Sequence, residues 1–562
     1  MHKIKSIKAM ENKFKKSRLV NQASMIKSFI RPISCETILS LRQLAKEKRD
    51  NRNFVFHNLI QIISNKDTLL LAYQLIKSTF GIIASLNAGW VEKTSQRLKA
   101  GKFVFTTLKN GLVPKDEQIV QKAISLVLET IYEPIFSPHS HGSRRGKGNH
   151  TALKEIKTSF SEAVWIIQAN TSKCFDCIDH KILLTLLKKK IKCDKTIALI
   201  KSSLSCGYIF EKTGTYRPKV GFVTDFVLGP ILSNIYLDEV DQILTQQQKS
   251  FNSIVKKRLR NPVIKTLTYK LNKKFTTKGE RQTIRLEIAK CYRSLNINYK
   301  RLFFVRYLEY FFIGIVGHYR DAVLSRDQIK KFLLDSLKLE LNMTKIINFS
   351  TNKVFFLGVF IRRAYRKEKI VIKDVRKDKF RTPKSTHRVS FYAPIKSLFE
   401  SFTKKGFFKR KQSKFIAKSV KTLSNFEHGS ILRYYNSIIY GILNYFSFVD
   451  NKKSLGSLIH NLKMSAARTL ALKYKKRAIK PVFIEYGKLL SCPRTGVSLN
   501  IPKISVRDKL FLIDVRMVED VIKENNLKSL CYTTNCKVDG KPNELKGSRS
   551  VWEEVPKNPN IY

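Results

Sequence analysis

The sequence predicts an α+β protein in which a mixed core is followed by a helical and strongly basic last third. Short apolar runs typical of strands alternate with helical periods in the middle of the chain. An aromatic and aliphatic stripe at helical spacing occupies residues 431–446, and cations crowd the segments around it. A length of 562 residues allows about two to four domains with hydrophobic cores of their own.

The N-terminal part of the chain is basic at first and then helical. In the first thirty residues Glu11 is the only acid, which is typical of a transit peptide and equally of a basic RNA-binding arm. We expect residues 1–40 to be loosely held. Residues 41–160 show helical apolar periods at Leu69–Lys77 and Ile119–Ile131, separated by short basic loops.

Strands and helices interleave over residues 161–365. The predicted strands are Trp165–Asn170, Phe303–Arg306, Phe311–Gly317 and Val354–Arg362. The predicted helices are His180–Lys189 and Asp327–Leu341. The turn Tyr307–Tyr310 joins the two middle strands. Residues 244–300 are rich in Lys, Arg, Gln and Asn and have little apolar periodicity, so we interpret them as a surface insertion.

The last third begins with a basic stretch and continues with two long helices. The first helix carries Ile431, Tyr435, Ile438 and Ile442 at helical spacing. The second is predicted from about residue 454 to 475 and ends in the basic cluster Lys473–Arg477. Residues 491–562 have mixed composition and no strong pattern.

The charge balance predicts a polyanionic partner. Lys and Arg total 107 against 43 acidic residues, which leaves a formal charge of +64. A folded protein with this much self-repulsion is best explained by binding to nucleic acid, with counterion release supplying much of the affinity. AT-rich coding inflates Lys, but the acidic residues are not equally inflated. A basic membrane-surface protein is the alternative, yet no apolar stretch approaches the roughly 20 residues of a membrane span.

The nine cysteines are scattered and predict neither a disulfide framework nor a metal site. Cys174 and Cys177 form a C-x-x-C motif, but no second pair stands at zinc-ribbon spacing. We interpret both as small packing residues, and we expect the protein to hold no metal.

Several local strings occur in an order that is similar to one protein family. Ser140-His-Gly-Ser-Arg-Arg-Gly-Lys-Gly-Asn-His-Thr-Ala-Leu153, Cys174-Phe-Asp-Cys-Ile-Asp-His180 and the block Gly221–Asp241 resemble conserved blocks of group II intron reverse transcriptases. Arg306–Gly317 occupies the place of R-Y-A-D-D-F-x-I-G-I, and Phe356-Leu-Gly358 matches the strand after it. The remaining strings, Leu432–Val449 and Thr469–Lys475, resemble maturase domain X.

The resemblance implies the fingers and palm of a right-hand polymerase, followed by an α-helical, thumb-like domain X. The domains expected on this basis are a basic arm (1–40), a fingers-like region (41–160), a degenerate reverse transcriptase palm (161–365) with the insertion 244–300, domain X (370–490) and a tail (491–562). No histidine follows His460, so we expect no His-Asn-His endonuclease in the tail and no DNA partner.

The resemblance also implies three palm aspartates that hold two Mg²⁺ ions, and this sequence departs from the family at all three. The corresponding positions are Asn170, Glu309 and Tyr310. The Pro-Gln-Gly of the family is Val223-Thr224-Asp225, and its Phe-Arg-Pro is Ser143-Arg144-Arg145. With one carboxylate left, two closely spaced ions lack the negative charge that offsets their repulsion. We therefore expect no catalytic residue and a lost reverse transcriptase activity.

The RNA-binding half of the resemblance is better preserved. The candidate RNA contacts are Arg144, Arg145, Lys147, Lys404, Lys405, Lys409, Arg410, Lys411, Arg433, Asn436, Lys473, Lys475, Lys476 and Arg477. Tyr and Phe side chains among these cations could stack on unpaired bases.

Taken with the resemblance, these features predict a maturase that binds group II-type intron RNA and promotes splicing by stabilising the active ribozyme fold. The protein itself needs no cofactor, whereas the intron RNA requires Mg²⁺, and other splicing factors are further candidate partners. Two alternatives remain open, an active RNA-directed DNA polymerase of a mobile intron and a general organellar RNA-binding protein. The composition favours an organelle, with the plastid slightly preferred over the mitochondrion.

Overall fold

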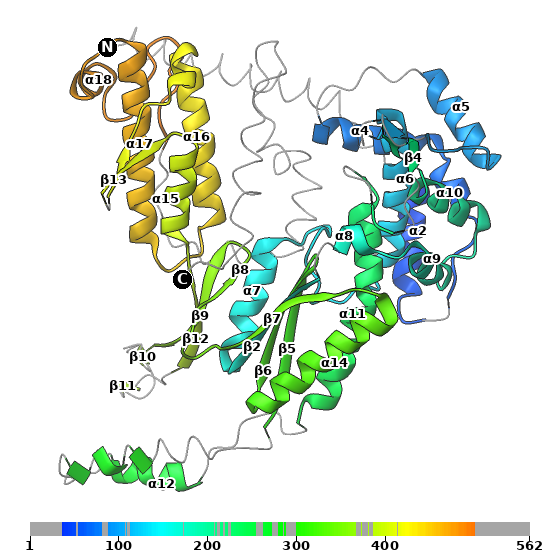
Figure 1. The fold of residues 1–562 in the computed structure, drawn as a ribbon, viewed down its shortest axis with the longest axis horizontal. Coiled ribbons are helices and arrows are strands. Elements are labelled where there is room, and N and C mark those ends of the chain that lie inside the picture. Colours follow the sequence, from blue (N-terminus) through cyan, green and yellow to red (C-terminus); the bar gives the residue numbers. More distant parts are fainter. Residues whose placement is uncertain are drawn as a thin grey trace, which may run out of the picture. The chain divides into compact units, whose positions relative to one another are not determined.

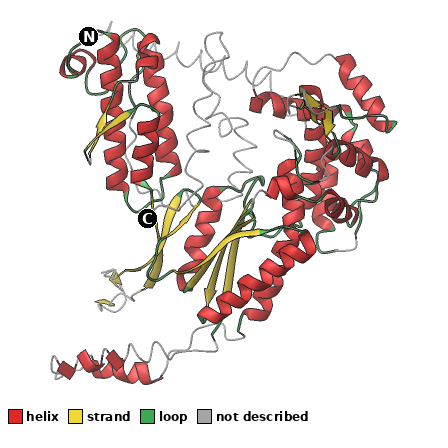
Figure 2. Ribbon diagram, in the orientation of Figure 1, coloured by secondary structure: helices red, strands yellow, loops and turns green. Residues whose placement is uncertain are grey.

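The computed structural model describes most of residues 36–500, as two compact units. The gaps lie at 52–53, 81–87, 107, 110–112, 172–173, 207, 211–213, 217–219, 223–225, 254–261, 272–278, 281, 285, 288–298, 367–371, 374–379, 382–385 and 413. The first unit comprises Met1–Ser137, Lys173–Glu239 and Leu333–Leu339, and the second comprises Pro138–Ser172, Val240–Phe332 and Glu340–Tyr562. Helices and strands are mixed, as the α+β prediction requires (Figure 2). Among the described residues, no helix has both the length and the apolar character of a membrane span.

The first unit is mainly helical. Its helices are α2 (Glu36–Glu47), α3 (Leu59–Ile63), α4 (Lys66–Phe80), α5 (Ala88–Lys99), α6 (Lys115–Tyr132), α8 (Cys174–Cys177), α9 (His180–Lys188) and α10 (Asp194–Leu204). A small sheet has the order β1-β3-β4 (Leu108–Lys109, Tyr208–Phe210, Gly214–Tyr216). Helix α6 packs against α2, α3 and α4. Asp116 and Glu117 in its first turn complement the helix dipole. The helical periods predicted at 69–77 and 119–131 are thus confirmed.

The second unit contains a four-stranded antiparallel sheet of order β5-β6-β2-β7 (Figure 1). Its strands are β2 (Trp165–Thr171), β5 (Arg301–Tyr307), β6 (Tyr310–Val316) and β7 (Leu341–Asn348). Helix α7 (Asn149–Ser159) and the 3-10 helix η1 (Phe160–Glu162) contribute Leu153, Ile156 and Phe160 to the hydrophobic core that also contains residues of this sheet. At Gly314 an added Cβ would lie 2.6 Å from Cδ1 of Phe160, so the close approach requires glycine.

The prediction of a single strand over residues 354–362 is wrong, because this segment forms a hairpin of two strands. Strands β8 (Val354–Phe356) and β9 (Val359–Arg366) pair antiparallel, and β12 (Thr386–Tyr392) completes the sheet β12-β9-β8. Leu357 and Gly358 have φ of 44° and 71°, so the chain reverses there. A separate pair is formed by β10 (Ile372–Lys373) and β11 (Phe380–Arg381).

The last third of the described chain is a helical bundle with a two-stranded ribbon. It contains α15 (Ile395–Lys404), the ribbon β13–β14 (Phe408–Lys411, Lys414–Ala417), η2 (Lys421–Asn425), α16 (His428–Tyr445), α17 (Lys452–Lys473) and α18 (Lys480–Tyr486). Helix α16 packs against α17, and the Tyr435 hydroxyl lies 3.0 Å from Ser465 Oγ and 3.1 Å from Thr469 Oγ1. Both long helices are therefore confirmed.

This bundle is not a separate appendage. One hydrophobic core runs from residues of the sheet, such as Val305 and Phe312, to Ile431 and Leu462 of the bundle. The hydroxyl of Tyr445 donates to the carbonyl oxygen of Leu357 at 2.7 Å. The ribbon β13–β14 lies within the basic stretch, where helical periodicity gave no indication of strands.

Several predicted boundaries also shift. Helix α2 begins at Glu36, inside the expected arm, and α7 belongs to the second unit rather than to the helices before residue 138. Helix α11 (Gly229–Phe251) continues past residue 244 because Leu244 is buried, and α12 (Pro262–Leu271) forms within the expected insertion. Helix α14 (Tyr319–Leu337) starts eight residues before the predicted one. Residues 223–225 and 501–562 lie outside the described residues.

Candidate nucleic-acid interface

The β5–β6 hairpin brings together the three positions at which the family resemblance implies metal ligands. Asn170 in β2 is the register partner of Tyr310 in β6. The backbone N–H of Thr171 donates to the carbonyl oxygen of Glu309 at 3.2 Å. Asn170, Glu309 and Tyr310 therefore meet at one end of the sheet, at the positions where the resemblance implies the three aspartates.

The chemistry of this group does not fit a pair of Mg²⁺ ions. Burial raises the pKa of Tyr310, and the hydrogen-bonded carboxylate of Glu309 raises it further, so the phenol is neutral at physiological pH. Asn170 contributes an amide whose Oδ1 is buried and has no hydrogen-bond partner within the described chain. One carboxylate, one amide and one phenol supply too little negative charge for two hard cations. Among the described residues, no group of three or more His, Cys, Asp or Glu could hold a metal.

A buried ion pair fixes the turn that carries Glu309. Arg306 donates from Nε and Nη2 to both carboxylate oxygens of Asp241, at 2.6–2.9 Å, and both side chains are fully buried. Its Nη1 also donates to the carbonyl oxygen of Leu308 at 3.1 Å. The buried pair and this hydrogen bond therefore hold the hairpin turn in place.

The loop before α7 extends the sheet on the other side of β5. The backbone N–H of His141 donates to Arg306 O at 2.8 Å, and that of Arg306 donates to His139 O at 2.9 Å. At Gly142 an added Cβ would lie 2.3 Å from the backbone nitrogen of Leu308. The loop thus packs tightly against the turn that carries Glu309.

Two of the candidate RNA contacts in this loop serve the loop itself. Arg144 Nη1 donates to Ser140 O at 2.8 Å. Lys147 Nζ donates to Pro138 O at 2.6 Å and to Ser140 O at 3.1 Å. Arg145 is exposed. Of the three cations, Arg145 is the one whose side chain faces solvent for an outside partner.

The carboxylate of Glu155 in α7 anchors the same loop through hydrogen bonds with the rings of His139 and His141. The distance between His141 Nε2 and Glu155 Oε2 is 2.6 Å. Burial raises the pKa of Glu155, but the hydrogen bonds from both histidines outweigh it and lower the pKa to about 2. Burial lowers the pKa of His141, although Glu155 opposes this. A carboxylate with a depressed pKa contributes stability above its unfolded pKa and loses it as the pH falls toward the folded pKa.

We therefore expect the Glu155 carboxylate to contribute about 3 kcal/mol to the free energy of unfolding above pH 4.5. This contribution is lost between pH 4.5 and 2. Urea unfolding of wild-type and Glu155→Gln proteins across this range measures it. The variant should show a shallower acid decline, whereas Glu427→Gln, at an exposed site, should follow the wild type. Parallel curves for Glu155→Gln and wild type would contradict the assignment.

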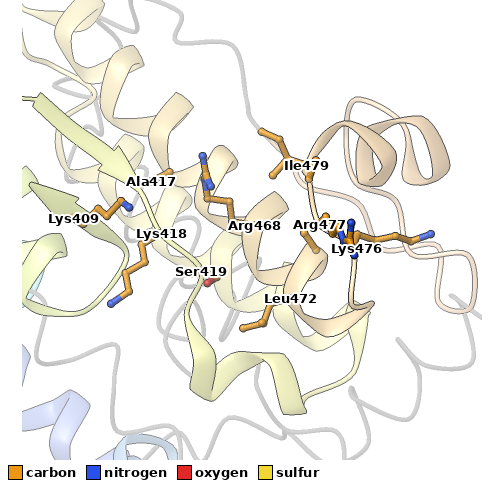
Figure 3. Close-up of a pocket in the computed structure, with 11 residues that line it drawn as sticks. Lys409, Ala417, Lys418, Ser419, Arg468, Leu472, Lys476, Arg477 and Ile479 are labelled. Carbon is orange, nitrogen blue, oxygen red and sulfur yellow. The ribbon is translucent and has the colours of Figure 1, made fainter. Parts of the chain in front are cut away.

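The helical bundle contains a basic hollow of about 530 Å³ (Figure 3). It is lined by Lys409, Ala417, Lys418, Ser419, Arg468, Ala471, Leu472, Lys476, Arg477, Ala478 and Ile479. We call this the domain X hollow. Figure 3 shows Lys409 and Lys418 on the ribbon side, Arg468 on α17, and Lys476 and Arg477 on the turn after it. Five cations and no acidic side chain line it.

Three of the residues predicted to contact RNA line the hollow: Lys409, Lys476 and Arg477. Two further cations there, Lys418 and Arg468, were not among the predicted contacts. Within the described chain, Lys476 is the one cation of the five that forms an ion pair, with Glu485 Oε2 at 3.1 Å. The solvent-facing position of Arg468 could have been found from the helical period of α17. That it lines the same hollow as Lys409 of the ribbon could not, because the two residues are far apart in the sequence.

The other predicted cations of the basic run lie on or next to the ribbon. Lys404 is exposed at the end of α15, and Lys405 is half-buried. Arg410 and Lys411 are exposed on β13, where Lys411 is the register partner of Lys414. The exposed positions of Lys404 and Lys411 are compatible with an external anionic partner. Lys405 does not fit this role because its Nζ is buried, and Arg410 Nε donates to Gln412 O at 3.3 Å within the ribbon.

The remaining candidates divide between solvent and internal contacts. Arg433 on α16 and Lys475 after α17 are exposed. Asn436 Nδ2 donates to Ser498 O at 2.9 Å, and its Oδ1 accepts from the Asn500 N–H at 2.8 Å. Lys473 Nζ lies 3.5 Å from Ser424 O. Asn436 therefore holds the segment 498–500 against α16, and its amide already has partners on both sides.

Comparison with known proteins places these two regions in order along the chain. Residues 109–361 match the family model of reverse transcriptase (RNA-dependent DNA polymerase), and residues 386–523 match that of type II intron maturase. The putative COX1/OXI3 intron 2 protein of Saccharomyces cerevisiae is 26% identical over 92% of this chain, which spans 64% of that protein. The group II intron-encoded protein LtrA of Lactococcus lactis subsp. cremoris is 29% identical over 79% of this chain and 80% of its own length.

A third relative has a name that bears on location. Nuclear intron maturase 4, mitochondrial, of Arabidopsis thaliana is 27% identical over 36% of this chain and 27% of its own length.

Proposed function

We propose that the protein binds a group II-type intron RNA and promotes its splicing. The proposal starts from the family of the chain, which is that of group II intron-encoded maturases and reverse transcriptases. The observation that carries the proposal is the combination of a maturase match over residues 386–523 with a five-cation hollow in that same region. A protein that binds the active RNA fold more tightly than misfolded forms shifts the RNA population toward splicing. The phosphoryl transfer chemistry and its Mg²⁺ requirement then belong to the RNA, and the protein needs no cofactor.

The domain roles follow from the same family. We assign the fingers-like role to the helices of the first unit, the palm role to the sheet β5-β6-β2-β7 and the thumb-like domain X role to α15–α18. The degenerate palm serves as a scaffold, because one core joins its sheet to the bundle. Other splicing factors are further partners in this proposal, and DNA is not.

The same proposal includes the loss of DNA synthesis. We expect no primer extension on an RNA template above the no-enzyme background with Mg²⁺ or Mn²⁺, because Asn170 and Tyr310 cannot replace carboxylate ligands. A reverse transcriptase with all three aspartates, assayed in parallel, shows that the template and conditions are adequate. Extension products that disappear in Glu309→Gln would instead favour an active polymerase with atypical ligands.

The location that we propose is an organelle. The slight preference for the plastid has no support among the three relatives, and one of them carries the word mitochondrial in its name. The mitochondrion is therefore at least as well supported as the plastid.

Crosslinking the protein to RNA in its own organelle and sequencing the bound RNA tests the proposed function. Enrichment confined to one or a few introns, with reads across their structural cores, supports a maturase and identifies its substrate. Broad recovery of exons and structural RNAs would favour a general organellar RNA-binding protein. That outcome would leave the match over residues 386–523 as a record of ancestry.

A further inference from the structure

The domain X hollow differs from a flat basic patch in its shape. Its volume of about 530 Å³ lies within the range of about 300–1,000 Å³ found for small-molecule sites. Its walls come from three separate parts of the bundle: the ribbon with the residues that follow it, helix α17, and the turn after α17. A ligand that enters it is therefore contacted from several sides.

The lining combines cations with apolar surface. Lys409, Lys418, Arg468 and Arg477 form no ion pair within the described chain. Ala471, Leu472 and Ile479 also line the hollow, and 43% of the Leu472 surface is exposed. An anion alone would leave this apolar surface in water, and an apolar ligand alone would leave the cations without a counter-charge. The complementary ligand carries both phosphate and a flat, weakly polar group.

The concave shape also selects among forms of RNA. The phosphates of a continuous duplex lie on a convex cylinder, which meets the rim of a hollow and leaves the floor empty. An unpaired nucleotide that turns out of a helix projects its base beyond the backbone, while its two flanking phosphates stay near the rim. Arginine side chains near such a base can also stack on it.

We propose that the domain X hollow receives one unpaired, extruded nucleotide of the bound RNA. The base lies on Leu472 and Ile479, and the flanking phosphates contact Lys418 and Arg468. This rests on the proposed function for the presence of RNA and adds the feature of the RNA that is recognised. A free nucleotide shares the same chemistry, so the test must distinguish the two sources.

The test uses the full chain and two hairpin RNAs that are identical except for one unpaired nucleotide within the stem of one of them. We expect the bulged RNA to bind about tenfold more tightly, because insertion of one base contributes roughly 1–3 kcal/mol. Arg468→Gln should reduce this ratio to near one while the affinity for the unbulged hairpin changes less than about twofold. Lys453→Gln, an exposed cation on the same helix, is the matched control and should leave the ratio unchanged.

A photoreactive base at the bulge should crosslink to a peptide within residues 471–479, and millimolar nucleoside monophosphates should not compete. Equal wild-type affinities for both hairpins, or an equal loss for both in Arg468→Gln, would overturn the proposal, as would effective competition by free nucleotides. None of these results would affect the recovery of intron RNA from the organelle, so the failure of this site and the failure of the proposed function remain distinguishable. Circular dichroism of both variants confirms that they fold.

Discussion

Asp241→Asn is expected to lower the free energy of unfolding by about 3–5 kcal/mol, because it leaves the guanidinium of Arg306 charged and buried without its counter-ion. Both side chains are fully buried, and the carboxylate accepts three hydrogen bonds from Arg306. Asparagine can accept with one oxygen, but it carries no charge to balance the guanidinium. Denaturant unfolding followed by circular dichroism measures the loss.

The matched control is an exposed ion pair. Glu239→Gln removes the partner of Lys189, whose side chain is 58% exposed, and we expect a loss of at most about 1 kcal/mol. If Asp241→Asn lowered the free energy of unfolding no more than this control does, the role assigned to the buried pair would be contradicted.

A double variant separates the cost of an unpaired charge from the net contribution of the pair. Replacing Asp241 with Leu and Arg306 with Met removes both charges, and such replacements are often neutral or stabilising. We expect this protein to recover much of the stability lost in Asp241→Asn. The hydrogen bond from Arg306 to Leu308 O is lost as well, so the turn that carries Glu309 should become more mobile. Faster amide hydrogen exchange in residues 307–310 would report that change.

Reversing Lys411 and Lys414 together to Glu is expected to weaken RNA binding by roughly 10- to 100-fold at low salt. The two residues are register partners on the ribbon and lie on the same face, which is also the face of Lys409. Each phosphate contact contributes a slope of about 0.7–0.9 to the dependence of log affinity on log salt. Loss of two contacts should lower the slope by about 1.4–1.8, and the introduced acids add repulsion.

The opposite face of the ribbon supplies the control. Arg410 pairs with Phe415, whose ring stacks on Phe399 of α15 at 4.9 Å, so this face is turned toward the bundle. Arg410→Glu should therefore change affinity and salt slope much less than the double reversal does. Fluorescence anisotropy with labelled intron RNA from low to moderate salt measures both quantities. Equal effects of the two variants would mean that RNA does not distinguish the faces.

Much of the central fold could be predicted from the sequence, because it depends on local patterns. The strands around Trp165–Asn170 and Phe311–Gly317 are apolar runs, and the turn between β5 and β6 falls at the break between two such runs, Tyr307–Tyr310. The hairpin β8–β9 was missed because its reversal depends on left-handed backbone at Leu357 and Gly358, which the apolar pattern does not reveal. The ribbon β13–β14 was missed because charge hides its alternation.

The amino-acid sequence by itself determined the charge excess, the two long helices and the side chains at Asn170, Glu309 and Tyr310. These are properties of residue type and of short periods, which exist before the chain folds. Only the tertiary structure decided which candidate RNA contacts face solvent and which already form hydrogen bonds within the protein. Arg144, Lys147 and Asn436 have internal partners, whereas Lys418 and Arg468 join Lys409 at one hollow. These relations join residues far apart in the chain, and such contacts arise from packing and have no local signature.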